Sequence, residues 1–161
     1  PGWTKLQDES LIIEPGHQYE WSWLLLKWSK LRICDERISV TILNLLNFAE
    51  KYGIDNKSLL VVDSVSAKFN ILKSDSKIWP QCERLKAWLV YYSNMKKVSL
   101  IELKKCYVAL ENLIGYLDEP FLGGWIECKF DKNKFANKIV KSSSFYHIVD
   151  ALEELLRINL N

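Results

Sequence analysis

The sequence predicts an all-α protein built as an array of αα-hairpins. Apolar residues recur at helical spacing in five separate stretches. Short connections join the first helix to the second and the third to the fourth, whereas long segments join the second to the third and the fourth to the fifth. The first, third and fifth helices are expected to begin near residues 17, 80 and 145, at nearly equal intervals. This spacing indicates a structural repeat of helix pairs.

Composition indicates a single globular domain over residues 1–161. Hydrophobic residues make up 48% of the chain and charged residues 26%, which is typical of soluble proteins. A net charge of +2 argues against nucleic acid or a membrane surface as partner. The four cysteines have no metal-ligand spacing, which argues against zinc, and they fit the reduced thiols of the cytoplasm. The sequence also has no His-x-x-x-His metal pair and no Gly-rich phosphate loop, so no metal or other cofactor is expected.

Two helices are predicted in the first hairpin. Pro15-Gly16 breaks the chain, and the first helix is expected over residues 17–33. Its spacing predicts that four apolar side chains anchor it in the core: Trp21, Leu24, Leu25 and Trp28. The second helix is expected over residues 37–52, with Gly53 as its C-cap and a buried stripe made of Ile38, Ile42, Leu45, Leu46 and Ala49.

The second hairpin follows a segment with short β elements. Residues 59–62 (LLVV) predict a strand, and residues 68–72 are expected to pair back on it. The third helix is expected to begin at Pro80, a favourable first-turn residue, and to end near Met95. Ser99 and Glu102 form a capping box that opens a fourth helix ending near Leu117.

The fifth helix is expected after a second long segment, residues 118–144. Gly123-Gly124 predicts a tight turn within that segment. The helix should follow three serines and end near Ile158, burying Ile148, Val149, Leu152, Leu155 and Leu156.

The order of the elements brings candidate functional residues together. If successive hairpins stack side by side, the first, third and fifth helices run parallel, and their N-termini lie at one end with both long segments. That end would collect His17, Glu20, Trp79, Gln81, Glu83, Trp125, Glu127 and His147.

Two histidines beside carboxylates and aromatic rings suit proton transfer. His147 lies near a helix start, where the macrodipole favours a neutral imidazole that can act as a base. Glu20 lies on the helix face of His17 and would favour its protonated form, so the two rings would form an acid–base pair. On local sequence alone, each histidine is also compatible with a hydrogen-bonded, inert role within a helix.

Four motifs in the same order resemble the N-acylglucosamine 2-epimerase superfamily, in particular its mannose isomerase and mannose-6-phosphate isomerase-like branch. They are residues 15–25 (PGHQYEWSWLL), 79–83 (WPQCE), 123–125 (GGW) and 144–147 (SFYH). The resemblance implies an (α/α)6 barrel with its active site at the end that carries the long loops.

The resemblance also implies a reaction and roles for single residues. The reaction is metal-independent isomerisation or C2 epimerisation of a sugar, or of its phosphate, by proton transfer. His17 and His147 match the catalytic histidines of the family. Its sugar-binding positions are matched by Glu20 and Trp79, while Gln81, Glu83 and Trp125 fall in motifs near the cleft.

A family barrel has twelve helices and five are expected here, so the chain is similar to the C-terminal portion of a barrel. Uncovered helix faces then predict self-association or a missing N-terminal segment as partner. Two alternatives remain open. One is an inactive remnant that binds sugar or serves in assembly. The other is a glycoside hydrolase using Glu20 and Glu83, which two convergent histidines fit poorly.

Overall fold

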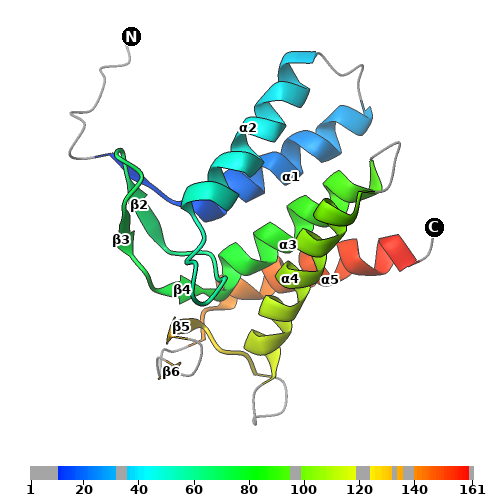
Figure 1. Ribbon diagram of the computed structural model, residues 1–161. Helices are drawn as coiled ribbons and strands as arrows, with labels where there is room; N and C mark the ends of the chain where they lie inside the picture. Colours follow the sequence, from blue (N-terminus) through cyan, green and yellow to red (C-terminus); the bar gives the residue numbers. More distant parts are fainter. Residues whose placement is uncertain are drawn as a thin grey trace.

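The computed structural model describes residues 11–31, 36–94, 99–118, 124–131, 134–135 and 140–159 (Figure 1). The helices in these ranges are α1 (Pro15–Leu31), α2 (Glu36–Tyr52), α3 (Ile78–Ser93), α4 (Leu100–Leu117) and α5 (Ser142–Asn159). The short strands are β1 (Ile12–Ile13), β2 (Ser64–Ser66), β3 (Ile71–Lys73), β4 (Ser76–Lys77), β5 (Cys128–Asp131) and β6 (Lys134–Phe135).

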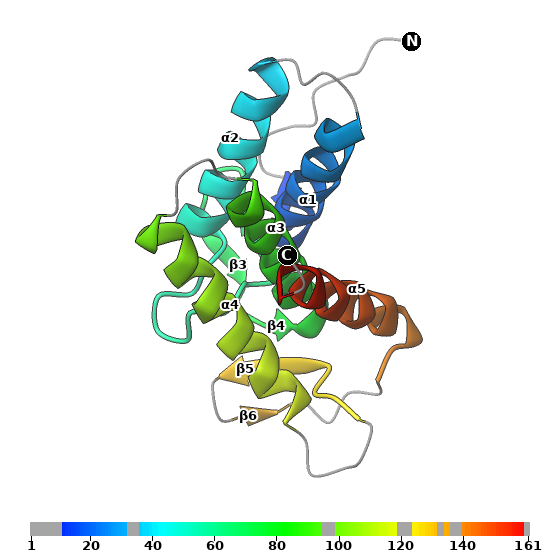
Figure 2. The same ribbon diagram turned by 90° about the vertical axis from the view of Figure 1, so that its right-hand side faces the viewer.

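Helix α3 is the centre of the arrangement. It packs against α1 on one side and α5 on the other, while α2 packs on α1 and α4 packs on α3. Figures 1 and 2 show α1, α3 and α5 beginning on the same side of the molecule, where the strands also gather. The expected array of αα-hairpins, with parallel first, third and fifth helices, is confirmed.

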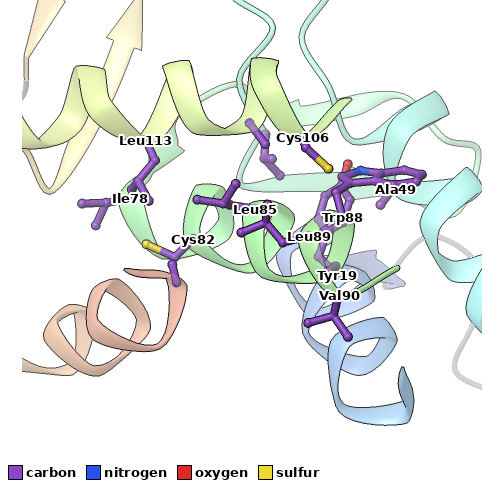
Figure 3. Packing of buried hydrophobic residues seen from close by; sticks show 14 of the residues in the cluster. Tyr19, Ala49, Ile78, Cys82, Leu85, Trp88, Leu89, Val90, Cys106 and Leu113 are labelled. Carbon is purple, nitrogen blue, oxygen red and sulfur yellow. The ribbon is translucent and has the colours of Figure 1, made fainter. Parts of the chain in front are cut away.

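Burial follows from this central position. Every residue from Pro80 to Val90 is buried, because neighbouring helices cover α3 on several faces. Figure 3 shows Leu113 and Cys106 of α4 facing α3, with Tyr19 of α1 and Ala49 of α2 near its far end. Each fully buried large apolar side chain stabilises such a core by roughly 1.5–3 kcal/mol.

The helix starts agree closely with the sequence signals. Pro15 is the first residue of α1, where its missing N–H costs nothing, so the helix begins two residues earlier than expected. Ser99 caps α4 by accepting a hydrogen bond from the Ile101 backbone N–H at 3.3 Å. Helix α3 begins at Ile78, two residues before Pro80.

The expected strand at residues 59–62 is wrong. These residues form a loop with one isolated bridge between Ile54 and Val61, and Leu59 has a positive φ of 61°. The Asp55 carboxylate holds the loop by accepting hydrogen bonds from the Ser58 N–H and hydroxyl. The hairpin instead pairs β2 with β3, and β1 adds to β2, while β4, β5 and β6 form a second antiparallel sheet.

Two predicted core stripes are also wrong in part. Trp21, Leu24 and Trp28 of α1 are exposed, and α1 instead buries Tyr19 and Leu26. On α5, three residues expected in the core are exposed (Val149, Leu152 and Leu156), whereas Ile148 and Ala151 are buried. Helix α3 packs against both α1 and α5. The helices α1 and α5 lie at the two ends of this row of three, so each keeps a face without a described neighbour.

Three of the cysteines are buried: Cys82, Cys106 and Cys128. Burial raises the pKa of the Cys106 thiol to about 12, which leaves it protonated and unreactive at neutral pH. Cys34, Pro120 and Gly123 lie outside the described residues. Among the described helices, none combines the length and apolar character needed to cross a bilayer.

Candidate active site

The starts of α1, α3 and α5 bring His17, Trp79 and His147 together. The Trp79 ring lies between the two histidines, with ring centroids 5.0 Å from His17 and 5.6 Å from His147. A pocket of about 220 Å³ opens beside them. It is lined by His17, Lys77, Trp79, Glu127, Lys141, Ser143, Ser144, Tyr146 and His147. The pocket therefore lies at the end where the N-termini of these three helices meet.

Gly16 makes room for the Trp79 ring at the start of α1. A Cβ atom at this position would overlap that ring and lie 3.1 Å from Pro80 Cβ. Because Gly16 precedes His17 directly, the absence of a side chain lets α3 approach the first turn of α1. The close approach places the aromatic ring against His17.

His147 is held from behind by a buried carboxylate. Its Nδ1 lies 2.5 Å from Glu83 Oε1, and Glu83 is fully buried. An ionised carboxylate can only accept hydrogen bonds, so Nδ1 carries the ring proton and donates a hydrogen bond to Glu83. Nε2 is then the ring nitrogen left for the pocket that His147 lines. His147 lies in the second turn of α5 rather than the first, where the effect of the helix dipole is weaker than expected.

His17 has a different partner from the one expected. Its Nδ1 lies 3.1 Å from Glu14 Oε2, and both side chains are about half exposed. Glu20 is partly buried and does not line the pocket, although it lies close enough to Tyr146 to act on its charge. Desolvation and the negative charges of Glu20 and Glu83 together raise the pKa of Tyr146, whose ring centroid is 3.9 Å from that of His147.

Glu127 organises the first turn of α5. Its Oε1 accepts a hydrogen bond from the Ser144 hydroxyl at 2.8 Å. Its Oε2 accepts from the Lys141 backbone N–H and from Trp125 Nε1. This carboxylate positions the segment that carries His147 while it also lines the pocket. Trp125 contributes through this bond and by stacking on Phe145, outside the pocket lining.

The predicted site residues therefore fall into three groups. His17, Trp79 and His147 line the pocket, and Glu83 lies directly behind His147. Glu20 and Trp125 lie nearby without lining it. Gln81 is fully buried, and its side-chain amide bonds to the backbone of Val61 and Lys77.

Sequence reasoning missed several members of the pocket, and a partner of His17. Lys77 and Tyr146 flank predicted site residues in the sequence, and that proximity was the available signal. Glu14 lies one helical turn before His17, and the same spacing rule that selected Glu20 would have found it. Among the described residues, no group of three or more His, Cys, Asp or Glu side chains could hold a metal ion.

Comparison with known proteins decides the family. The family model for N-acylglucosamine 2-epimerase (GlcNAc 2-epimerase) matches residues 2–151. The chain belongs to this family. It is 30% identical over 152 residues to a mannose-6-phosphate isomerase from Rhizobium meliloti (strain 1021), covering 92% of this chain and 38% of that relative. Family membership makes this a chain of the sugar isomerase and 2-epimerase group.

Solved structures show the same architecture. A D-mannose isomerase aligns over 91% of this chain and 37% of its own, with a TM-score of 0.78 and 23% identity. A cellobiose 2-epimerase from Spirochaeta thermophila DSM 6192 aligns over 96% of this chain and 40% of its own, with a TM-score of 0.81 and 14% identity. The described helices thus form part of an (α/α)6 barrel, and the chain spans about two-fifths of the length of these relatives.

Proposed function

We propose that this chain carries the histidine pair of a metal-independent sugar isomerase or 2-epimerase. The observation that supports the proposal most strongly is the placement of His17 and His147 on either side of Trp79, in the lining of one pocket. Membership of the N-acylglucosamine 2-epimerase family supports a sugar as the substrate class.

The proposed reaction is a proton transfer next to the sugar carbonyl. His147 Nε2 removes the proton from C2 of the open-chain aldose, while His17 protonates the carbonyl oxygen to give an enediol. Return of a proton to C1, with loss of the O2 proton, yields the ketose. Return of a proton to the opposite face of C2, with loss of the O1 proton, yields the epimer. Both outcomes balance without a metal or redox cofactor.

Other residues take supporting roles in this proposal. The Trp79 ring offers an apolar face on which a sugar ring can stack. Glu20, one helical turn after His17, is proposed to bind sugar hydroxyls at the edge of the pocket. Glu83, Gln81 and Trp125 are proposed to act through the elements they position, since none of them lines the pocket.

The exposed apolar stripes suggest how the site is completed. Trp21, Leu24 and Trp28 on α1 and Leu152 and Leu156 on α5 lie on the two outer members of the central row. We infer that further barrel helices, either from an N-terminal segment or from a second copy of this chain, cover them. The chain would then be the C-terminal part of a barrel, and its buried thiols fit a cytoplasmic protein.

A second candidate is a sugar-binding or assembly module without activity. It is favoured by the size of the pocket, about 220 Å³ between three helices, which lies below the usual range of ligand pockets. In this case the histidines would still bind sugar hydroxyls, but no proton would move.

Proton NMR in heavy water separates the two candidates. The folded chain is incubated with mannose, glucose, fructose, N-acetylmannosamine, mannose 6-phosphate or cellobiose. Deuterium at C2 of an aldose or C1 of fructose supports the enzyme, and the sugar that exchanges identifies the substrate class. No exchange from folded chain with any of these sugars, while binding remains detectable, supports the module.

A further inference from the structure

Lys86 is a buried cation behind the candidate site. It lies on α3 one turn after Glu83, and its side chain is 2% exposed. Removing an ammonium group from water costs several kcal/mol, and a hydrophobic residue of the same volume would avoid that cost. Lys86 does not line the pocket, so it cannot contact substrate there. Its burial therefore requires an explanation other than substrate binding.

All three central helices contribute to the surroundings of Lys86. From α3, Glu83 Oε1 lies 2.7 Å from Nζ. From α5, Asp150 Oδ2 lies 3.7 Å away on a partly exposed side chain. From α1, the Trp23 ring places its centroid 3.9 Å from Nζ, a distance typical of a cation–π contact. The thiol of Cys82 is also within range, and burial chiefly raises its pKa while Lys86 acts in the opposite direction.

One carboxylate oxygen joins Lys86 to His147. Glu83 Oε1 forms an ion pair with Lys86 Nζ and a hydrogen bond with His147 Nδ1, whereas Oε2 has no hydrogen-bond partner among the described residues. A lone carboxylate against Nδ1 would favour an imidazolium ring. An imidazolium has no lone pair with which to remove a proton from carbon. A cation on the same oxygen opposes that effect.

We infer that Lys86 is a positioning residue that fixes the Glu83 carboxylate and balances its charge. His147 then stays a neutral ring, with its Nδ1–H donating a hydrogen bond to Glu83 and its Nε2 lone pair available to the pocket. The role of Lys86 in proton transfer rests on the proposed function. Its effect on the His147 ring does not, and it can be measured without turnover.

The test is a pH titration of the histidine rings by NMR. The chain contains two histidines, so a long-range nitrogen–proton spectrum gives two sets of ring signals, which a His17→Asn variant assigns. The wild-type chain should show a neutral His147 ring with its proton on Nδ1. Lys86→Met keeps the side-chain length and removes the charge, and should raise the titration midpoint of His147 by about one pH unit or more.

Two internal controls accompany this variant. The His17 midpoint should not change, because the partner of that ring is Glu14. Lys86→Arg keeps the charge and should leave His147 closer to wild type than Lys86→Met does. A folded Lys86→Met chain with an unchanged His147 midpoint and an unchanged proton position would overturn the inference.

A measurement on the wild-type chain covers the case in which Lys86→Met does not fold. The ammonium signal of Lys86 should exchange slowly with water and should be shifted upfield by the Trp23 ring. A wild-type spectrum in which the His147 proton is on Nε2, or in which no protected ammonium is found, contradicts the proposed contacts. Loss of sugar turnover alone would bear on the proposed function and not on this result.

Discussion

Two carboxylates that pack at α3, Glu50 partly buried and Glu83 fully buried, have different kinds of partners. Glu50 of α2 accepts hydrogen bonds from the Tyr19 hydroxyl, Trp88 Nε1 and two nitrogens of Arg84, so that both of its oxygens are used. Glu83 of α3 engages His147 and Lys86 through Oε1, and its Oε2 has no hydrogen-bond partner in the described part of the chain. The first carboxylate is saturated by groups that stay protonated at neutral pH, whereas the second holds a histidine that can change its charge.

The difference separates a structural ion pair from a candidate functional one. Burial alone would raise the pKa of Glu50, but the charge and hydrogen bonds of Arg84, with those of Tyr19 and Trp88, hold it below its ordinary value. This cluster joins α1, α2 and α3 and stays charged. The Glu83 cluster joins α3 and α5 directly behind the pocket. Substitutions in the two clusters should therefore separate stability from chemistry.

The largest loss of stability is expected for Arg84→Met. The change leaves the Glu50 carboxylate without its cation, and breaking such a buried pair typically costs about 3–5 kcal/mol. Urea unfolding measures the loss, and the exposed Lys104→Met serves as a control within about 0.5 kcal/mol of wild type. If Arg84→Met also shifts the titration midpoint of His147 by about one pH unit or more, the two clusters are not independent.

Glu83→Gln should reduce proton transfer more than it reduces stability. An amide at this position can still accept from His147 Nδ1, but it no longer pairs with the charge of Lys86. Deuterium exchange into the responding sugar should fall by roughly 10²-fold or more. Glu153→Gln, an exposed substitution on α5, is the matched control. An exchange rate within twofold of wild type would show that the Glu83 carboxylate is not needed for proton transfer.

The pH dependence of stability should depend on Glu50. Its pKa is lower in the folded chain than its ordinary value of 4.5. The stability that it contributes is therefore present above that value and is lost as the pH falls through the folded pKa. Between about pH 5 and pH 3 the wild-type free energy of unfolding should fall more steeply than that of Glu50→Gln. Parallel curves from urea titrations would contradict the lowered pKa.

The smallest effect on stability is expected on the exposed stripe of α5. Leu156 is 60% exposed, so Leu156→Glu should change the free energy of unfolding by less than about 0.5 kcal/mol. The same change should reduce self-association, measured by sedimentation, if this stripe contacts another copy. A wild-type chain that is already monomeric at high concentration would argue against that contact.

The sequence predicted the helices well because their signals are local. Apolar spacing, Pro15 and the Ser99 cap act within one or two turns, and these helices lie close to where they were expected. The meeting of His17, Trp79 and His147 was predicted from the order of short and long connections. That argument needs only the rule that successive hairpins stack side by side.

Contacts between distant residues could not be predicted in the same way. Glu83 and His147 are 64 positions apart, and no local pattern assigns one to the other. Which face of α1 or α5 is buried depends on the neighbouring helices, which apolar spacing does not show. The spacing therefore placed Trp21 and Leu152 in the core, and both are exposed. The apolar residues 59–62 predicted a strand, but the Gln81 side chain hydrogen-bonds to the backbone N–H and C=O of Val61. A side chain thus satisfies groups that a neighbouring strand would otherwise pair, and no local pattern in the sequence shows this.

The central claim is that His17 and His147 act as one proton-transfer pair. The most direct test compares deuterium exchange in wild type, His17→Asn, His147→Asn and the double variant, using the sugar that exchanges best. The account predicts that each single substitution reduces exchange to background and that the double substitution reduces it no further. Exchange that persists in either folded single variant at more than a tenth of the wild-type rate would contradict the claim.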